Sequence, residues 1–107
     1  ADILEMVCRP EELVWLQEQR ADRRGLLAKV IFSAKECAYK AQYPLSGTML
    51  EFHDFRIQLH ADEERFEAEF MRDCAPFMKM QRLLGRVRIG KGGIACAIII
   101  GNRRGTF

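Results

Sequence analysis

The sequence predicts an α+β fold in which N-terminal helices pack on one face of a small antiparallel sheet. Helical patterns fill the first part of the chain, up to about Gln42, and patterns that alternate apolar with polar residues follow Gly47. Helices that come first and strands that come afterwards favour separate helical and sheet layers. The 107 residues are enough for one small domain with a single core.

Two short helices are expected near the N-terminus. Residues 2–8 carry enough apolar side chains for one or two helical turns. The run Cys8–Glu12 is typical of a helix start, because Pro10 suits the first helical turn and the two glutamates favour the positive helix end. We expect this second helix to reach about Arg20 and to bury Leu13, Leu16 and Trp15.

A third, longer helix is expected from about Leu26 to Gln42, after a charged connector at Ala21–Gly25. Its end is predicted from Pro44, because the residue before a proline is displaced from the helical region. One side of this helix is apolar and lets another element approach closely, and it holds Leu27, Val30, Ala34, Ala38 and Ala41. The opposite side spans roughly 140° and holds Phe32, Lys35, Glu36, Tyr39 and Lys40.

The second half of the chain predicts a series of strands. Phe55–His60 and Phe66–Phe70 each alternate apolar with polar residues, and the polar run Ala61–Glu64 between them predicts a hairpin. A short strand and a glycine-rich turn are expected in Gly85–Gly93. Ile94–Ile100 is apolar throughout and predicts a strand that is buried on both faces.

Composition narrows the class of protein. The net charge is +2, from 17 basic and 15 acidic residues, which argues against a nucleic-acid-binding protein that relies on bulk charge. The sequence contains no signal peptide and no apolar run near 18 residues, so we expect no membrane span. A local basic patch for a phosphorylated small molecule remains compatible with this balance.

The four cysteines, Cys8, Cys37, Cys74 and Cys96, are far apart and form no C-x-x-C pair. This spacing argues against a zinc site. Cys37 and Cys96 lie in apolar runs and are interpreted as buried free thiols. A reducing, cytoplasmic location fits best, although four cysteines also permit three disulfide pairings.

The polar side of the third helix suits a phosphorylated substrate and a divalent metal. The Glu36 carboxylate offers hard oxygen ligands to Mg²⁺. Lys35 and Lys40 offer positive charge to a pyrophosphate, and a lysine close to a departing phosphate can stabilise it. The simpler interpretation is that Glu36 and Lys40 form an i,i+4 salt bridge on a solvated face.

The run Phe32–Ala41 resembles the signature of the 4′-phosphopantetheinyl transferase superfamily. That signature is an aromatic residue, a small residue, any residue, Lys-Glu, a small residue, two further residues and Lys. The first five residues of this run, Phe-Ser-Ala-Lys-Glu, resemble the form of the signature found in one branch of the family. That branch serves siderophore and other nonribosomal peptide synthetases. Phe52–Phe55, which leads into an alternating strand, and the apolar run Ile94–Ile100 also resemble later segments of that family.

The resemblance implies an enzyme that transfers the 4′-phosphopantetheine arm of coenzyme A to a serine of an apo acyl or peptidyl carrier protein, with Mg²⁺ as cofactor. On matching positions, Glu36 would be a metal ligand and a base for the attacking serine, directly or through water. Lys40 would contact the pyrophosphate and assist the leaving group, and Lys35 would hold a coenzyme A phosphate. Neither a nucleic acid nor a membrane is expected as a partner.

One part of the family pattern is absent from the sequence. The Asp-x-Glu motif, which supplies further metal carboxylates, does not occur before the Lys-Glu segment, and Asp2-x-x-Glu5 has the wrong spacing. We therefore expect residues 1–107 to be the C-terminal half of a pseudo-dimeric transferase that needs its N-terminal half or self-association for a complete site. The alternative is a catalytically silent domain that binds a carrier protein or partner subunit.

Other candidate residues have simpler interpretations. Gly90–Gly93 could cradle a phosphate, but it lacks the Walker spacing and is better explained as a hairpin turn. His53 and Asp54 could lie near the site, but hydrogen bonds at the start of a strand explain them better.

Overall fold

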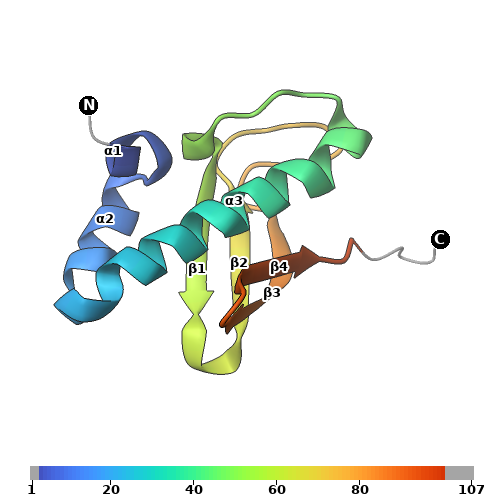
Figure 1. Cartoon of the computed structure of the whole chain (residues 1–107). Helices are drawn as coiled ribbons and strands as arrows, with labels where there is room; N and C mark the ends of the chain where they lie inside the picture. The colour runs from blue at the N-terminus through green and yellow to red at the C-terminus, as the bar shows by residue number, and fades with distance from the viewer. Residues whose placement is uncertain (1–2, 101–107) are drawn as a thin grey trace.

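A computed structural model describes residues 3–100, and it shows helices packed on one face of a four-stranded antiparallel sheet (Figure 1). The predicted α+β class is confirmed. The helices are α1 (Ile3–Val7), α2 (Pro10–Gln17) and α3 (Arg24–Ser46), with 3₁₀ turns η1 (Ala21–Arg23), η2 (Phe52–Asp54) and η3 (Ala61–Glu63). The strands are β1 (Phe55–His60), β2 (Arg65–Phe70), β3 (Arg82–Gly90) and β4 (Gly93–Ile98), and they lie side by side in this order.

Helix α2 begins at Pro10, as the sequence predicted, but it ends at Gln17 rather than near Arg20. The earlier end has an identifiable cause in Arg24. Its guanidinium donates hydrogen bonds to the carbonyls of Leu16 and Gln17 at 3.2 and 2.8 Å, and so takes up acceptors that the end of a helix leaves without partners. Leu16 is buried, as predicted, but Leu13 and Trp15 are only half-buried at the edge of the core.

Helix α3 runs through Pro44 to Ser46, so the predicted end at Gln42 is wrong. A proline inside a helix removes one backbone hydrogen bond, but only Leu45 and Ser46 follow Pro44 in α3, so little of the helix lies beyond the missing bond. The helix ends instead at Gly47, whose positive φ of 67° suits glycine and whose N–H donates to the Tyr43 carbonyl at 2.8 Å. Within residues 3–100, no helix combines the length and the apolar character that crossing a bilayer requires.

The core lies between α3 and the inner face of the sheet. The predicted hairpin forms with Phe55 opposite Phe70 and His60 opposite Arg65, so that alternate side chains of both strands turn inward. The apolar side of α3 faces them as expected. Buried core residues from these elements are Leu27, Val30, Ile31, Ala34, Ala38, Phe55, Ile57, Phe66, Ala68, Phe70, Leu83 and Val87.

Strand β4 is not buried on both faces, which corrects the expectation for Ile94–Ile100. It is the last strand of the sheet, and its side chains alternate between exposed and half-buried. Ile94, Cys96 and Ile98 are the half-buried ones, and the neighbouring alanines are exposed. Because β4 is apolar on both sides, its sequence could not reveal that only one side is covered.

Two smaller expectations also have clear outcomes. Gly90–Gly93 forms the turn between β3 and β4, with Gly90 paired to Gly93, as predicted. Cys37 and Cys96 are half-buried rather than buried, and Cys96 lies on the edge strand β4, whereas Cys8 and Cys74 are buried. All four thiols are free, and no disulfide joins them.

The close approach of β2 and β3 yields a stability prediction. Gly85 lies opposite Phe66, and a Cβ added at Gly85 would lie 2.2 Å from Cζ of this buried ring. Gly85→Ala should therefore lower the free energy of unfolding by about 1–3 kcal/mol, the usual cost of overpacking. Urea denaturation measures this change. Gly90→Ala is the matched control, since an added Cβ there meets no heavy atom within 4 Å; equal effects of both changes would contradict the argument.

Candidate functional site

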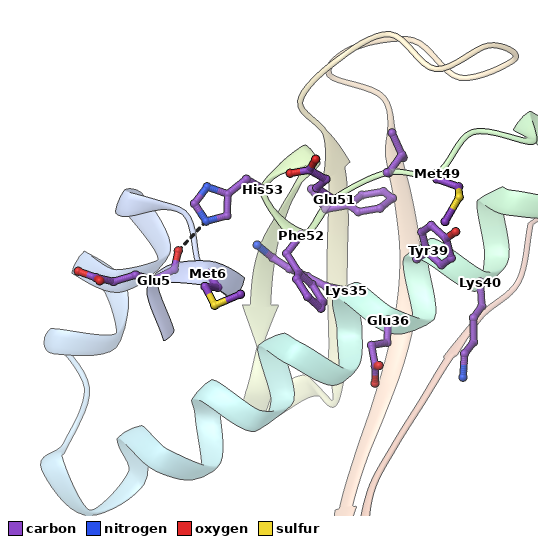
Figure 2. A pocket seen from close by; sticks show the side chains of 12 residues that line it. Glu5, Met6, Lys35, Glu36, Tyr39, Lys40, Met49, Glu51, Phe52 and His53 are labelled. Carbon is purple, nitrogen blue, oxygen red and sulfur yellow. Dashed lines mark hydrogen bonds between the residues drawn. The ribbon is translucent and has the colours of Figure 1, made fainter. Parts of the chain in front are cut away.

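A pocket of about 830 Å³ lies along α3, between this helix, α1 and the segment that leads into β1 (Figure 2). Apolar side chains form much of its surface, and acidic and basic groups lie among them. It is lined by Glu5, Met6, Lys35, Glu36, Tyr39, Lys40, Met49, Leu50, Glu51, Phe52, His53 and Phe55. All three site residues predicted from the sequence are therefore at one pocket.

Glu36 and Lys40 are the two predicted site residues that remain accessible. They lie one turn apart on α3, are exposed, and leave the helix on the same side (Figure 2). Neither forms an ion pair with any residue between 3 and 100. The described structure therefore does not contain the i,i+4 salt bridge between Glu36 and Lys40 that the simpler interpretation predicted. The carboxylate and the ammonium are both available to a ligand in the pocket.

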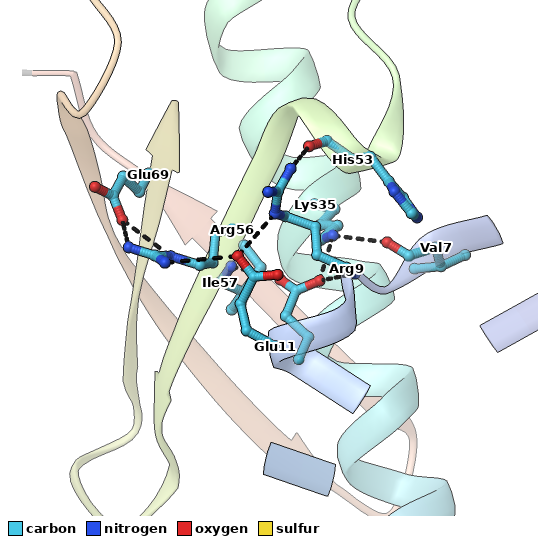
Figure 3. A network of polar contacts seen from close by, with 9 residues as sticks. Val7, Arg9, Glu11, Lys35, His53, Arg56, Ile57 and Glu69 are labelled. Carbon is cyan, nitrogen blue, oxygen red and sulfur yellow. Dashed lines mark hydrogen bonds and ion pairs between the residues drawn. The ribbon is translucent and has the colours of Figure 1, made fainter. Parts of the chain in front are cut away.

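Lys35 has a different environment from the one the helical wheel predicted. The residue is buried, and its ammonium donates to Glu12 Oε1 at 2.7 Å and to the Val7 carbonyl at 2.6 Å (Figure 3). The expectation that Lys35, Glu36 and Lys40 are displayed together is therefore wrong. The physical reason is that α1 and α2 cover this flank of α3, which a wheel drawn for one helix cannot include.

Glu12 is the centre of this buried network. Its Oε1 also accepts the Arg9 backbone N–H at 2.6 Å, and its Oε2 accepts the Ile57 N–H at 2.6 Å. One carboxylate thus joins α2, β1 and, through Lys35, both α3 and α1. Burial lowers the pKa of Lys35, and the neighbouring Glu12 carboxylate opposes this by favouring the charged form.

A second set of contacts holds the wall of the pocket that faces α3. The His53 ring donates from Nε2 to the Glu5 carbonyl at 2.8 Å, and Arg9 Nη1 donates to the His53 carbonyl at 2.6 Å (Figures 2 and 3). Asp54 accepts the Glu51 N–H at 2.8 Å. The predicted hydrogen bonding at the start of the strand is confirmed, and His53 lies at the pocket as well.

Sequence reasoning missed several residues of the site. It treated Glu12 only as part of a helix start, and it gave no role to Arg9, Met49 or Glu51. The signal for Glu12 was weak, since an acidic residue in the first helical turn is common for local electrostatic reasons. Its partner Lys35 is 23 residues away, so only the fold brings the two together.

The described residues do not form a complete magnesium site. Glu36 supplies a carboxylate at the pocket, but residues 3–100 hold no group of three or more His, Cys, Asp or Glu side chains that could bind a metal ion. Mg²⁺ prefers octahedral oxygen coordination and binds through carboxylates together with substrate phosphates and water. Glu36 fits as one ligand, and further ligands would have to come from outside residues 3–100.

The thiols do not offer an alternative catalytic chemistry. Burial raises the pKa of Cys8 and of Cys96 to about 11, and it also raises the pKa of Cys37. The thiolate is the nucleophilic form of cysteine, so these groups are largely inert at neutral pH.

Comparison with known proteins agrees with the sequence signature. The family model of the 4′-phosphopantetheinyl transferase superfamily matches residues 1–97. The 4′-phosphopantetheinyl transferase Svp of Streptomyces mobaraensis is similar to this chain, with 33% identity over 108 residues. The aligned region covers 97% of this chain and 44% of Svp, so the chain spans less than half the length of this curated relative.

The buried pair predicts unequal effects for two lysines of α3. Lys35→Met leaves Glu12 buried without its cation and should lower the free energy of unfolding by about 3–5 kcal/mol. Lys40→Met is the matched control, and it should change this free energy by no more than about 0.5 kcal/mol, because Lys40 is exposed. Urea denaturation monitored by circular dichroism measures both. A Lys35→Met variant as stable as the wild type would contradict the assigned ion pair.

Proposed function

This chain belongs to the 4′-phosphopantetheinyl transferase superfamily, and we propose that it contributes Glu36 and Lys40 to the site that transfers the arm of coenzyme A to a carrier protein. The acceptor is the serine hydroxyl of an apo acyl or peptidyl carrier protein. The products are the holo carrier protein and adenosine 3′,5′-bisphosphate. The observation that carries the proposal is that both side chains line one large pocket and are not engaged with other side chains of residues 3–100.

Each residue has a role that its environment supports. The Lys40 ammonium, on an exposed and flexible side chain, contacts the pyrophosphate and stabilises the negative charge that develops on the leaving group. The Glu36 carboxylate is an acceptor for the serine proton, directly or through water, and a ligand for Mg²⁺. A bound Mg²⁺ would add positive charge next to the phosphates.

Contact of Lys35 with a coenzyme A phosphate stays a prediction from the family signature. The free protein holds this ammonium in contact with Glu12 and Val7, so a phosphate could reach it only after the buried ion pair has opened.

We further propose that the chain is the C-terminal half of a two-lobed transferase of the type that serves siderophore and nonribosomal peptide synthetases in the cytoplasm. The Phe-Ser-Ala-Lys-Glu opening of the signature supports the type. The alignment, which covers 44% of Svp, supports a second lobe. That lobe, or a second copy of this chain, would supply the carboxylates that residues 3–100 do not place beside Glu36.

A second function is supported by the same shortage of carboxylates. A domain with a single metal ligand could bind a carrier protein without turning over coenzyme A. The two functions differ in one assay, in which the chain is mixed with coenzyme A, Mg²⁺ and an apo carrier protein, and the mass of the carrier is followed. Mass gain equal to the arm supports the transferase, and carrier binding without mass gain supports the silent domain.

The roles of Glu36 and Lys40 yield a prediction for the full-length transferase. Glu36→Gln and Lys40→Ala should each lower kcat/KM for carrier loading by about 10²-fold or more. The first change removes the proton acceptor and metal ligand, and the second removes the positive charge beside the leaving group. The fold should survive both changes, since both side chains are exposed. Mass spectrometry of the carrier measures the rate. Lys29→Ala and Glu18→Gln are exposed controls outside the pocket; a Glu36 or Lys40 variant as active as these controls would refute its assigned role.

A further inference from the structure

We propose that Glu12 and Lys35 are positioning residues, which build the coenzyme A pocket and orient Glu36 without touching the ligand themselves. The proposal rests on the proposed function for the identity of the ligand. It gives Glu12 a role in the site, and it replaces phosphate contact by Lys35 with an indirect effect through α1 and β1.

The geometry of the pair leaves little room for a ligand. An ammonium group has three N–H donors, and two of those on Lys35 are directed at Glu12 and Val7 at 2.7 and 2.6 Å. The side chain of Lys35 is 0% exposed and that of Glu12 is 2% exposed. The pair is therefore closed to solvent, although Lys35 belongs to the wall of the pocket.

The pair connects three walls of the pocket. Val7 ends α1, the helix that contributes Glu5 and Met6 to the pocket, and its carbonyl is the acceptor that Lys35 occupies. Glu12 fixes the Ile57 N–H of β1, two residues after Phe55, which also lines the pocket. Lys35 itself belongs to α3, the third wall. Loss of either charge would release α1 and β1 from α3 together.

The pair also fixes the direction of Glu36. Neighbouring residues of a helix point about 100° apart, so anchoring Lys35 against α1 and α2 sets the rotation of α3 at this turn. Glu36, which also lines the pocket, then leaves α3 on the opposite side from Lys35 (Figure 2). In the Lys-Glu pair, the lysine holds the helix in place and the glutamate faces the ligand.

The variant Glu12→Gln distinguishes a positioning role of Lys35 from direct contact with phosphate, because the two roles predict opposite changes in coenzyme A affinity. If Lys35 bound phosphate directly, removing its buried partner would free the ammonium and leave coenzyme A binding unchanged or tighter. If the pair positions the pocket, Glu12→Gln should weaken binding about tenfold, as should Lys35→Met. Titration calorimetry of the 107-residue chain with coenzyme A and Mg²⁺ measures the affinity, and unchanged or tighter binding by Glu12→Gln would overturn the proposal.

Two comparisons separate positioning from a general loss of stability. The two residues act as one unit, so their effects should not multiply. The double variant Glu12→Gln/Lys35→Met should lose less coenzyme A affinity than the product of the losses in the two single variants. Arg56→Gln removes a cation from a second ion pair, with the largely buried Glu69, outside the pocket. It should lower stability but leave coenzyme A affinity unchanged. The proposal would be overturned if the losses of affinity in the two single variants multiplied fully in the double variant. It would also be overturned if Arg56→Gln lost as much coenzyme A affinity as either single variant.

A second readout does not depend on coenzyme A. The Cys8 amide, which donates to the Leu4 carbonyl at 2.7 Å, reports on the end of α1. In Glu12→Gln and Lys35→Met its hydrogen exchange should become about tenfold faster relative to the Phe70 amide of the sheet, and in Lys40→Ala it should not change. If the wild-type chain alone fails to bind coenzyme A, the proposed site needs its second lobe for binding, and exchange alone decides the positioning role. Unchanged exchange at Cys8 would overturn it.

Discussion

The buried ion pair between Glu12 and Lys35 is the interaction on which the arrangement of the helices depends. Removing two charges from water is costly, and their attraction repays this cost only where the remaining hydrogen-bonding groups are satisfied. Here both carboxylate oxygens accept short hydrogen bonds, and the ammonium has a second acceptor in Val7. The net stabilisation by such a pair is small, but the loss of one partner is costly. The pair therefore specifies how α1, α2 and β1 meet α3 more than it adds to overall stability.

This constraint gives two adjacent residues opposite environments. Lys35 is buried against the N-terminal helices, and Glu36 is exposed at the pocket. A helix cannot direct neighbouring side chains to the same place, so a Lys-Glu dipeptide in this setting divides into an anchoring residue and a residue that faces the ligand. The same division explains why the pocket wall formed by α1 depends on a side chain that belongs to α3.

The sequence was sufficient for features that depend on local pattern. Alternation in Phe55–His60 and Phe66–Phe70 predicted the hairpin, because one face of the sheet is covered and the other is not. It was insufficient where the outcome depends on what else packs nearby. Ile94–Ile98 has the same apolar character whether an edge or a central strand is formed, and Lys35 looks like a surface residue until α1 and α2 cover it. Glu36 and Lys40 could be placed at the pocket because no element within residues 3–100 buries their side chains, which stay exposed.

The electrostatics of the pocket bear on what the rest of the enzyme has to supply. Glu5, Glu36 and Glu51 line it, whereas Lys35 is neutralised by Glu12, so Lys40 carries the remaining ammonium of the lining. An excess of carboxylates repels a pyrophosphate unless positive charge compensates for it, and this repulsion is strongest where water is excluded. Under the proposed function, a divalent cation bound at Glu36 and basic side chains from outside residues 3–100 would reverse the local potential. An acidic lining of this kind favours coenzyme A with its phosphates bound to the metal over coenzyme A as a free anion. The binding of the metal and the binding of the substrate are then mutually dependent.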